Sequence, residues 1–124
     1  MDKQLQEKLF EKYPKIFKQR HLPNTETSMC YGIQCPDNWY DLIDTLCACI
    51  QQYIQFKDNE IDKEIEKFKG SLYPREFKRI ICQATQVKTK FNMLRFYVTG
   101  RDDYIKGLIQ MAENMSLKIK KEKK

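Results

Sequence analysis

The chain has 124 residues, 41% of them hydrophobic and 32% charged, which is typical of one globular domain and excludes a disordered chain. No run approaches about 18 consecutive apolar residues, which excludes a membrane-spanning helix. The net charge of +6 is unevenly divided: residues 1–20 carry +3, residues 21–69 carry −5 and residues 70–124 carry +8. This division predicts a basic C-terminal half that attracts an anionic partner.

The N-terminal segment lacks the apolar stretch of a secretory signal, so we expect a cytoplasmic protein in a reducing compartment, with no membrane partner. Five cysteines fit that compartment, because their number is odd and none forms a Cys-x-x-Cys pair. We interpret them as buried thiols that act as small hydrophobic residues. Cys30 and Cys35 would need a distant third ligand to hold a metal, and neither a metal nor another cofactor is predicted.

The helical spacing of apolar residues predicts a first helix over about residues 2–13, ended by Pro14. The following residues, 18–36, have no clear period and contain Pro23, Asn24, Gly32 and Pro36. They are predicted to form a long ordered loop, with a short strand near residues 29–33.

The clearest helix signal begins at Asp37 or Asn38, either of which can cap a helix. Apolar residues then recur at steps of three and four, which predicts the core-facing stripe of a central helix. The stripe consists of Trp39, Leu42, Ile43, Leu46, Ile50, Tyr53 and Ile54. A separate charged helix is predicted over residues 58–69, with Asp58 as its cap and Gly70 at its end, followed by a connector at residues 71–74.

Between residues 86 and 99 the pattern changes to the alternation of a β-hairpin. With Asn92 and Met93 as a two-residue turn, one face is apolar and faces the core: Val87, Thr89, Phe91, Leu94, Phe96 and Val98. The other face is polar and cationic: Gln86, Lys88, Lys90, Arg95, Tyr97 and Thr99. Met93 suits a type I′ turn poorly, so a longer loop that shifts the pairing is the alternative.

This pairing places Lys90 directly opposite Arg95, and like charges so placed cost a few tenths to about 1 kcal/mol. An anion would relieve the repulsion. It could be an acidic patch of the same chain, a phosphate-bearing ligand or the carboxylates of a partner. The alternative is a solvated sheet face on which lysines prevent edge-to-edge aggregation.

A last helix is predicted from about Asp102 to Leu117, followed by a lysine-rich tail, residues 118–124, that frays. The predicted fold class is therefore α+β. One small domain spans residues 1–117, in which an antiparallel hairpin of two strands, or a sheet of three, packs against three to four helices.

Two segments carry a resemblance: residues 35–47, Cys-Pro-Asp-Asn-Trp-Tyr-Asp-Leu-Ile-Asp-Thr-Leu-Cys, and residues 87–98, Val-Lys-Thr-Lys-Phe-Asn-Met-Leu-Arg-Phe-Tyr-Val. They resemble a group of small uncharacterised proteins of tailed phages and prophages, over about residues 28–117. In that group the segments read Cys-Gly-Asp-Gly-Trp and Val-Lys-Glu-Lys-Phe-Gly-Gly-Leu-Arg-Phe-Tyr-Val. This chain lacks those glycines and the C-terminal Cys-x-x-Cys that often occurs in the group. The resemblance implies seven matched positions, Asp37, Trp39, Lys88, Lys90, Phe91, Arg95 and Tyr97. Of these, we predict that Asp37, Trp39, Lys88, Lys90, Arg95 and Tyr97 bind a ligand.

Two of these positions also have a purely structural interpretation. Trp39, in the first turn of an apolar helix, is typical of a core anchor, and Asp37 is typical of a cap. In their functional interpretation, the aromatic ring of Trp39 and the carboxylate of Asp37 line the opening of a binding site and face the basic hairpin.

An enzyme is not predicted, because the single histidine, His21, has no patterned partner and no glycine-rich phosphate loop occurs. Cys82, close to Lys78 and Arg79, is the one cysteine worth testing as a nucleophile. The resemblance implies an accessory protein that acts against host defence in the host cytoplasm. It would sequester an anionic nucleotide signal, at a site between subunits of a homo-oligomer, or block a host protein. The alternative is a nucleic-acid-binding protein that uses the basic hairpin.

Overall fold

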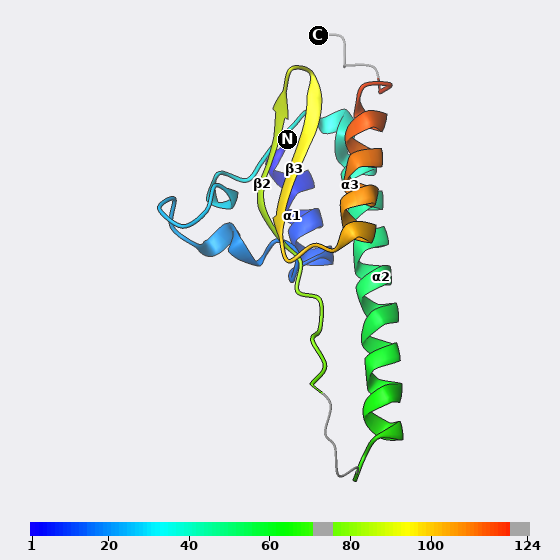
Figure 1. Ribbon diagram of the computed structural model, residues 1–124. Helices are drawn as coiled ribbons and strands as arrows, with labels where there is room; N and C mark the ends of the chain where they lie inside the picture. Colours follow the sequence, from blue (N-terminus) through cyan, green and yellow to red (C-terminus); the bar gives the residue numbers. More distant parts are fainter. Residues whose placement is uncertain (71–75, 120–124) are drawn as a thin grey trace.

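The computed structural model describes residues 1–70 and 76–119 (Figure 1). Its elements, in chain order, are α1 (Lys3–Lys12), β1 (Ile33–Gln34), α2 (Tyr40–Lys67), β2 (Gln83–Lys90), β3 (Met93–Thr99) and α3 (Asp103–Ser116). Three helices and a three-stranded sheet confirm the predicted α+β class. The predicted connector and the end of the lysine-rich tail, residues 120–124, lie outside the described residues.

The sheet has the order β1-β2-β3, with β1 parallel and β3 antiparallel to β2. The short strand predicted near residues 29–33 is β1, in which Ile33 pairs with Val87. Its other side is held by α1, because the backbone N–H of Ile33 donates to Oε1 of Gln6 at 2.9 Å. Figure 1 shows α1 behind the hairpin, while α2 and α3 run side by side in opposite directions.

Helix α3 covers the outer edge of β3. The backbone N–H of Leu94 donates to Oγ of Ser116 at 2.9 Å, and that of Phe96 donates to Oε2 of Glu113 at 3.0 Å. An unpaired strand edge is a template for aggregation, and these side chains accept from two of its donors. The edge therefore needs no lysines for its protection.

The predicted stripe of the central helix forms much of the core. Trp39, Leu42, Ile43, Leu46 and Ile50 are buried, and they pack in one cluster with residues of α1, the sheet and α3. The last helix is also confirmed. It begins after Asp102, whose carboxylate accepts from the backbone N–H of Ile105 at 2.9 Å.

The prediction of a separate helix over residues 58–69 is wrong, because α2 continues unbroken for 28 residues, about 42 Å. Asp58 resembles a cap in the sequence but lies inside the helix. It and Asp62 pair instead with Arg79, at 3.4 and 2.5 Å. This ion pair joins the second half of α2 to the extended segment that precedes β2, which Figure 1 shows beside it.

The predicted cap of the central helix is also wrong. Residues Asp37–Trp39 form a 3-10 turn, and α2 begins after it without a side-chain cap hydrogen bond. A carboxylate oxygen of Asp37 accepts instead from the backbone N–H of Asp2, at 2.6 Å. Asp37 therefore joins the N-terminal segment to the start of α2.

A polar network joins α1 to α2. Tyr13 donates its hydroxyl to Oδ1 of Asp44 at 2.5 Å, and Nζ of Lys12 lies 2.6 Å from the same oxygen. Burial raises the pKa of Asp44, but the hydrogen bonds from Lys12 and Tyr13 outweigh it and hold the pKa below the ordinary value of 3.8. The ionised carboxylate is thus the form that stabilises the fold.

We expect Asp44→Asn to lower the free energy of unfolding by about 1–2 kcal/mol at neutral pH. Because the folded-state pKa is depressed, this contribution is present above the unfolded-state pKa and is lost as the pH falls through the folded-state value. Urea unfolding from pH 7 down to about pH 2 should therefore show the two proteins converging in acid. Glu11→Gln, an exposed change on α1, is the control. A difference for Asp44→Asn that did not vary with pH would contradict the assignment.

Candidate anion-binding site

The hairpin turns at Phe91 and Asn92, one residue earlier than predicted. Both residues have positive φ, 53° and 65°, as a two-residue type I′ turn requires. Asn92 tolerates the left-handed region well and is in the turn as predicted, while Phe91 takes the other turn position and Met93 begins β3. Phe91 is therefore not part of the core face, and its side chain is 83% exposed.

Moving the turn by one residue shifts the pairing of the strands by two. Lys88, rather than Lys90, lies opposite Arg95, and Lys90 lies opposite Met93. A shift of two residues in the register leaves each side chain on the same face of the hairpin. The core side keeps Val87, Thr89, Leu94 and Phe96. The opposite side, called the basic face below, consists of Gln86, Lys88, Lys90, Met93, Arg95 and Tyr97.

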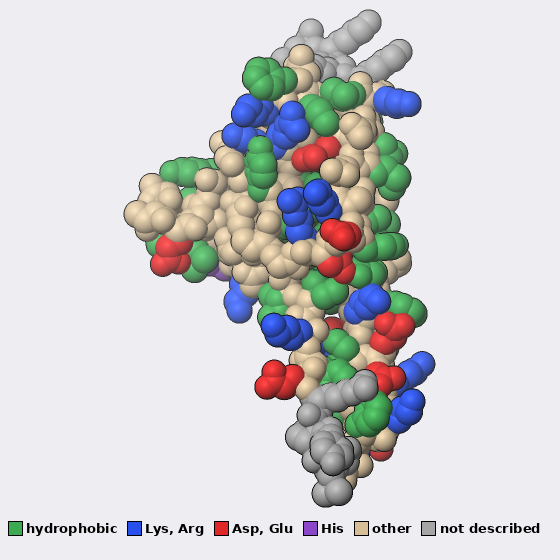
Figure 2. Space-filling model, in the orientation of Figure 1, with side chains coloured by type: hydrophobic (Ala, Val, Ile, Leu, Met, Phe, Trp, Pro, Cys, Tyr) green, Lys and Arg blue, Asp and Glu red, His purple; other side chains and the backbone are tan. Residues whose placement is uncertain are grey.

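The cations of the basic face have no acidic partner in the described part of the chain. Lys88, Lys90 and Arg95 form none of its ion pairs, and Nζ of Lys90 lies 5.6 Å from the centroid of the Phe91 ring. Figure 2 shows Lys and Arg side chains gathered over the hairpin. The predicted juxtaposition of like charges is thus present, with a different lysine opposite the arginine.

Arg95 is the least satisfied of these side chains. Its Nε is buried and has no hydrogen-bond partner within residues 1–70 and 76–119. A buried donor without an acceptor costs about 1–3 kcal/mol, and more for a charged group. An oxygen anion beside the guanidinium would offset the repulsion between Arg95 and Lys88.

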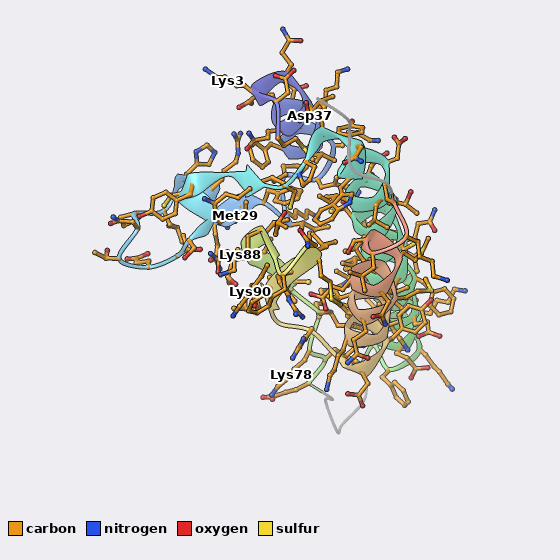
Figure 3. The ribbon with its side chains drawn as sticks, turned by 90° about the horizontal axis from the view of Figure 1, so that it is seen from above. Lys3, Met29, Asp37, Lys78, Lys88 and Lys90 are labelled. Atoms are coloured by element: carbon orange, nitrogen blue, oxygen red, sulfur yellow. The ribbon has the colours of Figure 1, made fainter. Side chains whose placement is uncertain are left out.

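The structure brings together four of the six predicted ligand residues, namely Lys88, Lys90, Arg95 and Tyr97. The other two lie elsewhere. Trp39 is 1% exposed and belongs to the core, so its ring is not accessible to a ligand. The carboxylate of Asp37 accepts a hydrogen bond from the N-terminal segment, and Figure 3 shows Asp37 far from Lys88 and Lys90. The predicted binding-site opening, in which these two residues face the hairpin, is not formed.

Phe91 is the residue that the sequence analysis missed. It was assigned to the core face, whereas it stands exposed at the tip of the hairpin beside Lys90. No local signal distinguishes this turn from the predicted one, because Asn92 belongs to both and the alternation fits both registers. Lys78 and Arg79, the two cations close to Cys82, are not on the basic face. Arg79 pairs with α2, and Lys78 lies on the segment before β2 (Figure 3).

The cysteines are free thiols. Burial raises the pKa of Cys82 to about 11, so this thiol is protonated at neutral pH. Burial likewise raises the pKa of Cys35 to about 12. Within the described residues, no group of three or more His, Cys, Asp or Glu side chains is placed to hold a metal ion.

Within the same residues, no helix has the length and apolar character needed to span a bilayer. The resemblance to the phage group rests on its two motifs alone, since no protein-family model, curated protein or solved structure matches this chain.

Proposed function

We propose that this protein is a non-catalytic binder whose basic face holds a phosphate-bearing ligand, such as a nucleotide. The observation that carries the proposal is the cluster of Lys88, Lys90 and Arg95 without a carboxylate partner in the described chain. Directly opposed Cβ atoms are about 5 Å apart, and alternate residues of a strand about 7 Å. One phosphate or diphosphate group can therefore contact all three side chains.

The guanidinium of Arg95 suits this ligand best. Its fork of donors matches two phosphate oxygens, whereas a lysine contributes a point charge. The Nε that has no acceptor in the described residues belongs to this fork. Lys88 and Lys90 would balance the remaining charge, and Tyr97, 43% exposed, offers a ring beside them.

The biological setting of the proposal comes from the resemblance to phage proteins. A phage accessory protein of this kind would act in the host cell by sequestering a nucleotide signal of host defence. The same cations could instead dock on the acidic surface of a host protein and block it. The two versions differ in whether a free nucleotide binds.

A second candidate, binding of single-stranded nucleic acid, is favoured by one observation. Two aromatic side chains, Phe91 and Tyr97, are exposed on the hairpin that carries the three cations. A sheet face of this composition can stack bases while the cations contact the backbone, with about 1–3 kcal/mol for each stacked base. Such binding would weaken steeply as the salt concentration rises.

We expect Lys90→Glu to weaken ligand binding at least tenfold, because it reverses the charge of one of the three cations of the cluster. Thermal-shift and calorimetric titrations would use inorganic diphosphate, nucleoside triphosphates, cyclic dinucleotides and a short single-stranded oligonucleotide, each at low and high salt. Lys78→Glu is the matched control, since it changes the net charge equally away from the basic face. Equal losses in both variants would show non-specific attraction and refute the site.

The candidates are separated by Phe91→Ala. It should weaken oligonucleotide binding several-fold and leave inorganic diphosphate binding unchanged. If no probe stabilises the wild-type protein, both nucleotide and nucleic-acid binding are refuted, and the host-protein version is tested by co-purification of the wild type against Lys90→Glu.

A further inference from the structure

An apolar groove runs between α2 and α3 on the side away from the sheet. Two cavities make up the groove, of about 270 and 390 Å³. The first lies between the N-terminal part of α2 and the C-terminal part of α3, where Leu42 and Met115 line it. The second is lined by Phe56 and Tyr104. Cys49 and Leu108 line both cavities, so they mark the middle of the groove.

The side chains along this groove are unusually exposed for their type. Phe56, Tyr104, Met111 and Met115 are between 48% and 59% exposed, and Figure 2 shows hydrophobic side chains along the edge formed by α2 and α3. Contiguous apolar patches rimmed by polar residues mark interaction surfaces. The residues of the groove are separate from those of the basic face, so binding at the groove is independent of the proposed function.

The charges of the groove are arranged symmetrically about its middle. Asp41 lines the first cavity and Lys57 the second. On α2 they are 16 residues apart, with Cys49 halfway between them. A second copy placed antiparallel, with a two-fold axis between the copies at the level of Cys49, would bring Asp41 of each copy to the level of Lys57 of the other. A two-fold interface requires such self-complementarity.

We propose that a second copy of this chain covers the groove in this antiparallel arrangement. The same axis carries Phe56 of one copy to the level of Leu42 of the other, which lines the 270 Å³ cavity. Cavities of roughly 150 Å³ admit a benzene ring, so the phenyl group fits. Tyr104 would likewise reach the level of Met111 and Met115, where sulfur–aromatic contacts are favourable.

Existing contacts of the two charged residues do not oppose this arrangement. Asp41 forms no ion pair in the described chain. Lys57 pairs with Glu60 at 3.5 Å, but exposed pairs of this type contribute little. Lys57 can therefore turn to a carboxylate of the second copy at low cost.

The size of the surface predicts a weak dimer. Between Asp41 and Lys57 the groove is about 24 Å long, and two adjacent helices are about 20 Å wide, giving roughly 500 Å² for each copy. The total of about 1,000 Å² is at the low end of specific interfaces. Dissociation in the micromolar range is expected, which sets the concentrations of the test.

Sedimentation of the full chain from low to several hundred micromolar concentration tests the proposal. We expect the wild type to dimerise and Asp41→Lys or Lys57→Asp alone to weaken dimerisation at least tenfold, because each places like charges at both ends of the interface. An equimolar mixture of the two variants should dimerise again, since each chain then supplies the charge that the other needs. Glu66→Lys, on α2 beyond the groove, is the matched control and should leave dimerisation unchanged.

The mixture also guards against misfolding, because a misfolded variant could not restore a dimer. Phe56→Ala should weaken dimerisation without changing the circular dichroism spectrum. A monomeric wild type throughout the range would overturn the proposal, and so would a dimer that is insensitive to all three substitutions. Retention of nucleotide binding by Asp41→Lys would show that the two proposed surfaces act separately.

Discussion

Trp39→Ala is expected to lower the free energy of unfolding by about 3–5 kcal/mol, the range typical of a large aromatic side chain removed from a core. Trp39 is 1% exposed and stands where the 3-10 turn passes into α2. Its loss would leave a cavity between this junction and the rest of the core, which cannot collapse without moving α2. Because Trp39 is the only tryptophan, unfolding in urea should be followed by circular dichroism rather than by fluorescence.

Trp39→Phe is the conservative comparison. Nε1 of Trp39 is buried and has no hydrogen-bond partner in the described chain, so phenylalanine removes an unsatisfied donor while it keeps much of the packing. We expect a cost of about 1 kcal/mol. Ligand binding by the folded variant should be unchanged, because Trp39 is remote from the basic face. Equal costs for the two substitutions would contradict the packing argument.

Gly100→Ala is the second large effect, with an expected loss of about 2–4 kcal/mol. Gly100 joins β3 to α3 with φ of +75°, a region unfavourable for alanine. An added Cβ would also lie 1.8 Å from the carbonyl oxygen of Ile81. This neighbour is backbone, so relief requires the segment before β2 to move away from the β3–α3 connection.

Gly107→Ala is the matched control, and it should change stability in the opposite direction. Gly107 lies within α3, and a Cβ there would meet nothing within 4 Å. Alanine is favoured over glycine in a helix by about 0.5–1 kcal/mol, so we expect stabilisation of that size. Urea midpoints measured at low protein concentration would compare the variants. Destabilisation by both substitutions would refute the distinction.

Most of the helices and the hairpin could be predicted because their signals are local. The three- and four-residue steps of the central helix and the alternation of the hairpin need no knowledge of distant segments. The start of α3 near Asp102 was also predicted from the sequence. The continuation of α2 was not, because Asp58 resembles a cap until Arg79, from a different segment, is seen to pair with it.

The register of the hairpin shows why a pattern can be correct and still insufficient. Shifting β2 against β3 by two residues leaves every side chain on its own face, so the hydrophobic alternation fits both registers equally well. The choice depends on which residues adopt positive φ in the turn. The structure assigns that conformation to Phe91 and Asn92, and Lys88 consequently lies opposite Arg95.

The sequence by itself determined that Lys88, Lys90, Arg95 and Tyr97 share one face, because side-chain direction in a strand has a period of two. Tertiary structure alone decided the surroundings of that face. It turned Asp58 and Asp62 of α2 towards Arg79, buried Trp39 and left Nε of Arg95 without an acceptor in the described chain. It also created the groove between α2 and α3. These features depend on contacts between segments far apart in the chain, which no local periodicity records.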